Sequence, residues 1–160
     1  MPYTPVIGTL AYVLRGEEVL LVHRTFRADD AHLGKYNGLG GKLADDEDIV
    51  SGMRRELREE AGIEVLSWRL RGTISWPGFG AEGEDWFGFI FVVDAFAGEP
   101  PAANEEGSLH WVRRDRLTDL PMWEGDRRWL PLVFDPDVTQ FHGVMPYADG
   151  RPTGWRVTTC

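Results

Sequence analysis

The stretch 41–63, GKLADDEDIVSGMRRELREEAGI, constrains the fold of this 160-residue chain more than any other part of it. Its spacing predicts a helix over 46–61, because side chains three and four positions apart then share one face. Asp45 or Asp46 is the expected N-cap of this helix. Gly62 is the expected left-handed residue that ends it.

The predicted helix carries an apolar stripe beside an acidic one. The apolar stripe consists of Ile49, Val50, Met53, Leu57 and Ala61, and the acidic stripe consists of Glu56, Glu59 and Glu60. Like charges four positions apart destabilise an isolated helix by about 0.2–0.5 kcal/mol per pair. The acidic stripe is therefore either a solvated face, the usual meaning of such a pattern, or a site for a hard cation such as Mg²⁺ or Mn²⁺.

The residues around the acidic stripe favour the cation site. They fit the pattern G-x5-E-x7-R-E-U-x-E-E-x-G-U, in which U is a bulky aliphatic residue, at every position: Gly41, Glu47, Arg55, Glu56, Leu57, Glu59, Glu60, Gly62 and Ile63. A chance match to the fixed identities has a probability on the order of 10⁻⁷ in a chain of this length. The pattern resembles the box of the Nudix hydrolases, which cleave nucleoside diphosphates linked to another group.

The resemblance implies a metal site and a set of catalytic residues. The expected metal ligands are the Gly41 carbonyl, Glu56, Glu59 and Glu60, with Glu106 as an additional ligand. Mg²⁺ is the expected ion, and Mn²⁺ is an alternative. Arg55 is expected to orient a glutamate of the box, and Glu47 to brace the preceding loop. The carboxylate that accepts a proton from water is expected to be Glu59 or one outside the box, such as Glu106.

The formal net charge of −9 is consistent with a metal-dependent enzyme. Proteins that bind nucleic acid need a basic surface to displace counterions, so the charge argues against that class. A phosphate substrate is also an anion, and metal ions that neutralise the acidic cluster resolve this conflict.

The chain as a whole predicts one soluble domain over residues 1–160. The longest apolar candidate, 86–93, is far shorter than the roughly 18 residues that a membrane helix needs. The N-terminal segment lacks the basic start and cleavage site of a signal peptide. Cys160 is the only cysteine, so a reducing cytoplasm is the expected location. We expect a monomer or homodimer whose partner is a small nucleotide, not a nucleic acid or a membrane.

Hydrophobic patterning predicts strands that surround the central helix. The expected strands are 6–14, 19–23, 64–76, 86–97 and 109–112, the expected short helices are 114–120 and 126–134, and a final hairpin joins 140–147 to 153–157 around Asp149 and Gly150. This order predicts a mixed α/β sandwich. The resemblance implies the same fold, an α/β/α sandwich with a mixed sheet and a central catalytic helix.

Segments outside the box resemble the oxidised-purine triphosphatases of the same family, which convert 8-oxo-dGTP to the monophosphate and pyrophosphate. These segments are KYNGLGGKL, EEGSLHWV, MWEGDRRWLPL and FHGVMPY. By this resemblance Asn37 and Asp126 read the base, and Trp123 stacks on it. The chain has Gly125 where the mammalian enzyme of this group carries the first of two consecutive aspartates, which leaves a single carboxylate to select the base. The bacterial mutator-type enzymes resemble this chain in carrying the Trp-Glu-Gly-Asp form.

The pocket walls and the phosphate end are predicted from residue type. Trp76, Trp86 and Phe26 are candidate walls. Arg24 is a cation at a strand end, and the loop from Gly40 to Lys42 lets the backbone approach a phosphate. Trp111 and Trp129 are expected in the core, and His23 is expected to be structural.

Three alternatives remain open at this stage. The first is the same chemistry on unmodified dNTPs, ADP-ribose or dinucleoside polyphosphates. The second is a Nudix-fold binding module without catalysis, although such modules commonly lose glutamates that this chain retains. The third is RNA 5′-end processing, which the absence of a basic groove disfavours.

Overall fold

The computed structural model describes all residues from Met1 to Cys160. Nine strands form one sheet in the order β11-β8-β5-β6-β1-β2-β3, with β4 paired to β1 and β7 paired to β2. Their bounds are β1 Val6–Arg15, β2 Glu18–Arg24, β3 Tyr36–Asn37, β4 Leu39–Lys42, β5 Glu64–Trp76, β6 Trp86–Ala97, β7 Gly107–Arg113, β8 Phe141–Val144 and β11 Arg156–Thr159. The sheet is mixed, because β1 is parallel to β6 and β5 is parallel to β8.

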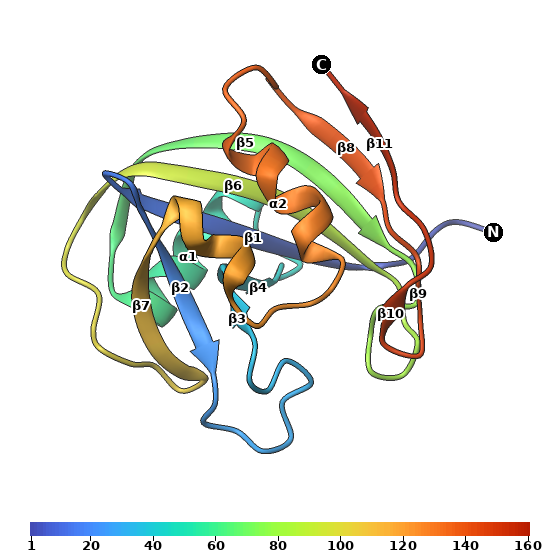
Figure 1. Cartoon of the computed structure of the whole chain (residues 1–160), viewed down its shortest axis with the longest axis horizontal. Coiled ribbons are helices and arrows are strands. Elements are labelled where there is room, and N and C mark those ends of the chain that lie inside the picture. Colours follow the sequence, from blue (N-terminus) through green and yellow to red (C-terminus); the bar gives the residue numbers. More distant parts are fainter.

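The helices cover the two faces of this sheet, with α2 (Asp126–Phe134) in front and α1 (Ile49–Ala61) behind in Figure 1. Side chains alternate along β1, so Tyr12 points to the α2 side while Ala11 and Val13 point to the α1 side. Each side has its own buried cluster. The α/β/α sandwich that the sequence predicted is therefore confirmed.

The α1 helix follows the predicted stripe, but it begins later than predicted. Met53, Leu57 and Ala61 are buried against the sheet, and Gly62 ends the helix with φ of 64°. The N-cap is Asp48, whose carboxylate accepts the backbone N–H groups two and three positions on at 2.9 and 2.8 Å. The prediction of Asp45 or Asp46 as N-cap is wrong, since only Asp48 places its carboxylate over the first turn.

The long antiparallel pair β5 and β6 has the predicted bounds. Arg71 projects from β5 and is almost fully buried, with 5% of its surface exposed. It donates hydrogen bonds to the carbonyls of Val133 at 2.8 Å and Asp135 at 2.9 Å, and to those of Leu132 and Thr139. These carbonyls lie at the end of α2 and just beyond it, where no helical donor is available. Arg71 thereby fixes α2 over the sheet.

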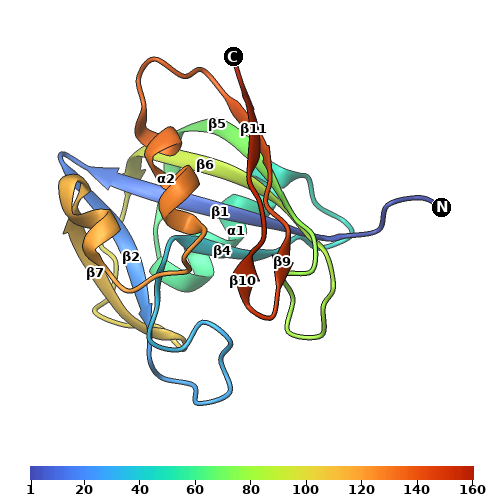
Figure 2. The same ribbon diagram turned by 45° about the vertical axis from the view of Figure 1, so that its right-hand side comes forward.

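The remaining elements follow the predictions with small differences. The segment η1 (Arg114–Asp119) is a 3₁₀ helix where a short helix was predicted. The final hairpin is divided: β8 pairs with β11, while β9 (Tyr147–Ala148) and β10 (Arg151–Pro152) form a separate ribbon around Asp149 and Gly150. Figure 2 shows both pairs along one side of the molecule. No helix has the length and apolar character needed to cross a membrane.

The aromatic residues that were expected in the core differ in their burial. Trp129 is 1% exposed within the cluster under α2, as predicted. Trp111 is only partly buried, at the edge of the α1-side cluster, so the core prediction holds for it in part. Its ring stacks on Phe96 with centroids 5.9 Å apart, and the Arg15 guanidinium lies 4.0 Å from the ring centroid.

Candidate active site

Arg55 organises the acidic face of α1. Its guanidinium donates to both carboxylate oxygens of Glu47 at 2.7 and 2.9 Å, to Glu56 at 3.0 Å and to Glu59 at 3.2 Å. Glu47 also accepts the backbone N–H of Ala44 at 2.8 Å. The Arg55 hydrogen bonds hold the pKa of the Glu47 carboxyl down to about 2, so it stays ionised. The predicted contacts of Arg55 with box glutamates and of Glu47 with its loop are present.

The glycines of β4 bring the backbone against the same carboxylates. A Cβ atom on Gly41 would lie 2.7 Å from Oε1 of Glu56, which is closer than any side chain tolerates. The Gly40 N–H donates to Oε2 of Glu60 at 3.3 Å. Pairing of β4 with β1 sets this position, because Gly41 lies opposite Thr9. Glycine at these positions therefore lets two carboxylates approach the sheet edge.

The carboxyl groups of Glu60 and Glu106 are shielded from solvent by burial. Burial raises the pKa of Glu60 to about 9, and the negative charges of Glu106 and Glu56 act in the same direction. Burial also raises the pKa of Glu106, although the nearby Arg24 charge opposes this shift. A cation placed among these carboxylates would stabilise their charged forms.

Asn104 ties the loop that carries Glu106 to the end of α1. Its amide donates to the Glu60 carbonyl at 3.2 Å, and its side-chain oxygen accepts the Glu106 N–H at 2.9 Å and the Gly107 N–H at 3.2 Å. Asn104 was not predicted from the sequence, because an asparagine in a loop has no distinctive pattern.

The acidic groups supply oxygen donors only, which suits Mg²⁺ or Mn²⁺. Glu56, Glu59, Glu60, Glu105 and Glu106 line one surface hollow beside α1. Their side chains are not arranged as three ligands around one common point, because Arg55 and the β4 backbone hold some of them. The donor chemistry and the desolvated charge of Glu60 nevertheless fit a divalent cation.

A cavity of about 320 Å³ lies next to the acidic hollow. Eight of the residues that the sequence predicted to bind substrate line it: Arg24, Asn37, Gly40, Lys42, Trp76, Trp86, Trp123 and Asp126. Gly41 and Glu106 also line it, and Glu106 lines the acidic hollow as well. At the β4 end the Lys42 ammonium lies 5.8 Å from the centroid of the Trp86 ring, and at the aromatic end near α2 the rings of Trp123 and Phe79 have centroids 4.9 Å apart. Phe26 is 57% exposed and lies outside this lining, so its prediction as a wall is wrong.

Three polar groups in the cavity are shielded from solvent or have no hydrogen-bond partner within the protein. Burial raises the pKa of the Asp126 carboxyl to about 7. The Asn37 amide nitrogen and the Thr9 hydroxyl are buried without a hydrogen-bond partner. Buried polar atoms are normally paired, so these groups are available to the polar atoms of a ligand.

Side chains from elsewhere in the chain fill the space next to the backbone before Asp126. A Cβ atom on Gly125 would lie 2.6 Å from the Tyr147 hydroxyl and would collide with the sulfur of Met145. Both obstructing residues come from the chain near β9. Met145 and Tyr147 therefore fill the space that a second carboxylate, at position 125, would occupy.

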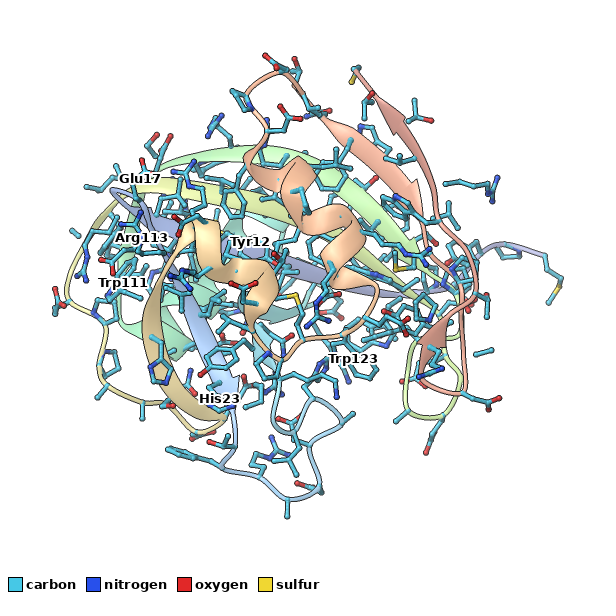
Figure 3. All side chains as sticks on the ribbon, viewed as in Figure 1. Tyr12, Glu17, His23, Trp111, Arg113 and Trp123 are labelled. Carbon is cyan, nitrogen blue, oxygen red and sulfur yellow. The ribbon has the colours of Figure 1, made fainter.

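His32 and Phe79 are cavity residues that the sequence analysis missed. Nδ1 of His32 accepts the indole N–H of Trp123 at 2.7 Å, and the Phe79 ring lies 4.9 Å from that of Trp123. His23 is elsewhere, at the end of β2, where it stacks on Tyr36 with centroids 4.1 Å apart (Figure 3). His32 and Trp123 are separated by 91 positions, so no local pattern could have revealed their contact.

The NUDIX domain family model matches residues 4–133, which include the whole box. The chain therefore belongs to the Nudix family and is a Nudix hydrolase. Nudix hydrolases generally use divalent metals such as Mg²⁺ and act on small nucleotide substrates.

Two vertebrate relatives carry the name oxidized purine nucleoside triphosphate hydrolase. The zebrafish (Danio rerio) protein is 36% identical over 133 residues, which cover 82% of this chain and 81% of the relative. The mouse (Mus musculus) protein is 35% identical over 143 residues, which cover 88% and 86%. Among solved structures, a MutT protein from Bacillus halodurans superposes with a TM-score of 0.82 at 27% identity, covering 95% of this chain and 97% of that one.

Proposed function

We propose that the protein hydrolyses oxidised purine nucleoside triphosphates, chiefly 8-oxo-dGTP, to the monophosphate and pyrophosphate. It acts on free nucleotides in the cytoplasm, with Mg²⁺ as its metal and Mn²⁺ as a substitute, and so keeps damaged bases out of DNA synthesis. The observation that carries this proposal is the single cavity whose aromatic end holds Asn37, Trp123 and Asp126 and whose other end reaches Gly41 and Glu106.

The aromatic end suits one purine base. A cavity of about 320 Å³ has the size of a small-ligand site, and aromatic surfaces stack favourably on a base. Asn37 offers an unpaired amide donor, and Asp126 offers a carboxyl group in the lining of the same cavity. Oxidation at C8 adds a carbonyl and an N–H donor to guanine. A site with fixed polar partners can distinguish such a change, since a mismatch leaves a buried group unpaired.

The other end suits the phosphates. Glu56, Glu59, Glu60, Glu106 and the Gly41 carbonyl would hold the metal, which supplies a positive charge that polarises the phosphates and lowers the pKa of a bound water. Arg24 and Lys42 line the cavity as cations near the phosphates. Arg55 orients Glu56 and Glu59 through the contacts described above.

The proton acceptor is Glu59 or Glu106. Glu106 lines both the acidic hollow and the nucleotide cavity, whereas Glu59 lines only the hollow. A carboxylate at Glu106 can therefore face both the attacking water and the triphosphate. Comparison of Glu59→Gln with Glu106→Gln separates the two roles, because loss of the base leaves a rate that no longer rises with pH.

Similarity supports the substrate class. The zebrafish and mouse relatives, at 36% and 35% identity, are both named for oxidised purine nucleoside triphosphates. Unmodified dNTPs, ADP-ribose and dinucleoside polyphosphates remain competing substrates. A binding module without catalysis is disfavoured because every box glutamate is present.

The test is a parallel measurement of kcat/KM for 8-oxo-dGTP, dGTP, dCTP and ADP-ribose with Mg²⁺, with identification of the released product. A preference for 8-oxo-dGTP over dGTP of more than about tenfold, or about 1.4 kcal/mol of transition-state binding, together with pyrophosphate as product, is the expected result. An equal rate for dGTP, or ADP-ribose as the best substrate, would overturn the proposal while leaving the family assignment intact.

A further inference from the structure

The indole of Trp123 is held by the loop that joins β2 to β3, residues 25–35. Its N–H donates to Nδ1 of His32 at 2.7 Å, and the His32 ring meets it edge-on at an interplanar angle of 83°. The Lys35 ammonium lies 4.5 Å from the centroid of the same indole. One loop therefore contacts both the N–H edge and one face of this ring.

The hydrogen bond fixes the protonation of His32. An indole N–H can only donate, so Nδ1 of His32 must be an acceptor without a proton. The neutral ring then carries its proton on Nε2. Burial lowers the pKa of His32 to about 4, so the ring is neutral near physiological pH and the hydrogen bond persists there.

The backbone of His32 is fixed as firmly as its ring. Asp30 accepts the His32 N–H at 2.9 Å and also binds the Arg24 guanidinium through two hydrogen bonds of 2.7 and 3.1 Å. Arg24 pairs in turn with Glu106 at 3.3 Å. The loop is therefore anchored at the phosphate end of the cavity while its His32 side chain reaches the aromatic end.

We propose that His32 is a positioning residue for nucleotide binding, which sets the plane of the Trp123 indole through its Nδ1 acceptor so that the ring can stack on a purine. This inference rests on the proposed function, because it assigns a purine to the Trp123 end. His32 acts through Trp123 and has no role in the cleavage step, so its loss should change KM and not kcat.

The test uses His32→Ala, which removes the acceptor, and His32→Asn, which puts an amide oxygen at the position of Nδ1. The Trp123 indole N–H is followed by NMR with ¹⁵N labelling, and Trp123→Phe identifies its signal among the seven tryptophans. Thermal unfolding of each variant reports whether the fold survives. Michaelis constants are measured for 8-oxo-dGTP and for dCTP.

In His32→Ala we expect the Trp123 N–H signal to move upfield and to exchange faster with water. We also expect KM for 8-oxo-dGTP to rise about fivefold to tenfold, the effect of one hydrogen bond of about 1 kcal/mol, with kcat within about twofold. KM for dCTP should change less, because a pyrimidine offers a smaller stacking surface. His32→Asn should restore the signal and most of the KM. In the Trp123→Phe background, His32→Ala should add no further loss.

An unchanged Trp123 signal in His32→Ala would overturn the proposal, and so would equal rises in KM for both nucleotides or failure of His32→Asn to restore binding. Failure of the proposed function is a separate observation, seen as absent turnover of 8-oxo-dGTP by the unsubstituted protein. The indole signal tests His32 in either case.

Discussion

Replacing Asp126 by Asn should reduce the pH dependence of the stability of the protein. Burial raises the pKa of this carboxyl from its ordinary 3.8 to about 7. Between these values the native state holds a proton that the unfolded state has released. The free energy of unfolding therefore falls as the pH rises through this interval, because unfolding releases this proton and a rising pH favours the state that has released it. The amide of the variant does not titrate.

The size of the effect on the free energy of unfolding follows from the width of the pH interval between the two pKa values of Asp126. Each pH unit over which the native state holds the extra proton changes the free energy of unfolding by about 1.4 kcal/mol. The interval from 3.8 to about 7 spans about three units, so the largest possible effect is about 4 kcal/mol. Below this interval the carboxyl is protonated in both states, and above it the carboxyl is ionised in both. The difference between parent and variant should thus change within the interval and be constant outside it.

The assay is urea unfolding of the parent and Asp126→Asn from pH 5 to pH 9 in EDTA, with the exposed Asp137→Asn as control. Glu60 and Glu106 also have raised pKa values, but they contribute equally to parent and variant and cancel in the difference. We expect Asp126→Asn to gain about 1.4 kcal/mol per pH unit over the parent between pH 5 and pH 7 and to level off above about pH 8. A difference that stays constant with pH would refute the reasoning, since a changed hydrogen bond alone gives only a fixed offset.

Three further predictions concern the two ends of the cavity. Glu59→Gln should lower kcat by about 100-fold or more, while nucleotide affinity measured by calorimetry stays near that of the parent. Full activity of this variant would disprove the metal and base assignments. Glu105→Gln is the control. Gly41→Ala should displace the Glu56 carboxylate, because its Oε1 would lie 2.7 Å from the new Cβ. We therefore expect kcat to fall at least about tenfold with little change in Tm. A normal kcat would contradict the close approach of Glu56 to Gly41. Asn37→Ala should raise KM for 8-oxo-dGTP more than for dCTP, and equal changes in the two steady-state values would place Asn37 outside the base site.

The parts of this fold with a local cause could be predicted from the sequence. Periodicity and a glycine stop define α1 apart from its first residues, and runs of apolar residues define β5 and β6. The start of α1 was missed because three nearby aspartates can each cap a helix. Of these aspartates, it is Asp48 whose carboxylate accepts the backbone N–H groups of Val50 and Ser51 in the folded chain.

The base end of the candidate site was predicted through resemblance to a known family. Asn37, Trp123 and Asp126 were assigned by resemblance to the oxidised-purine triphosphatases, and all three line the cavity. Phe26 was assigned from its aromatic character alone, and the polar loop that carries it turns the ring to solvent. The contact of His32 with Trp123 exists only in the folded chain, so no sequence window contains it.

The space next to Gly125 has a consequence for how this enzyme could diversify. Met145 and Tyr147 occupy it, so a second carboxylate beside Asp126 would require these two side chains, some twenty positions later in the chain, to shift. None of these residues belongs to α1, which lies on the opposite face of the sheet. Selection can therefore alter the aromatic end of the cavity while leaving the acidic helix untouched, and a two-aspartate variant would need Met145 and Tyr147 to make room for the added side chain.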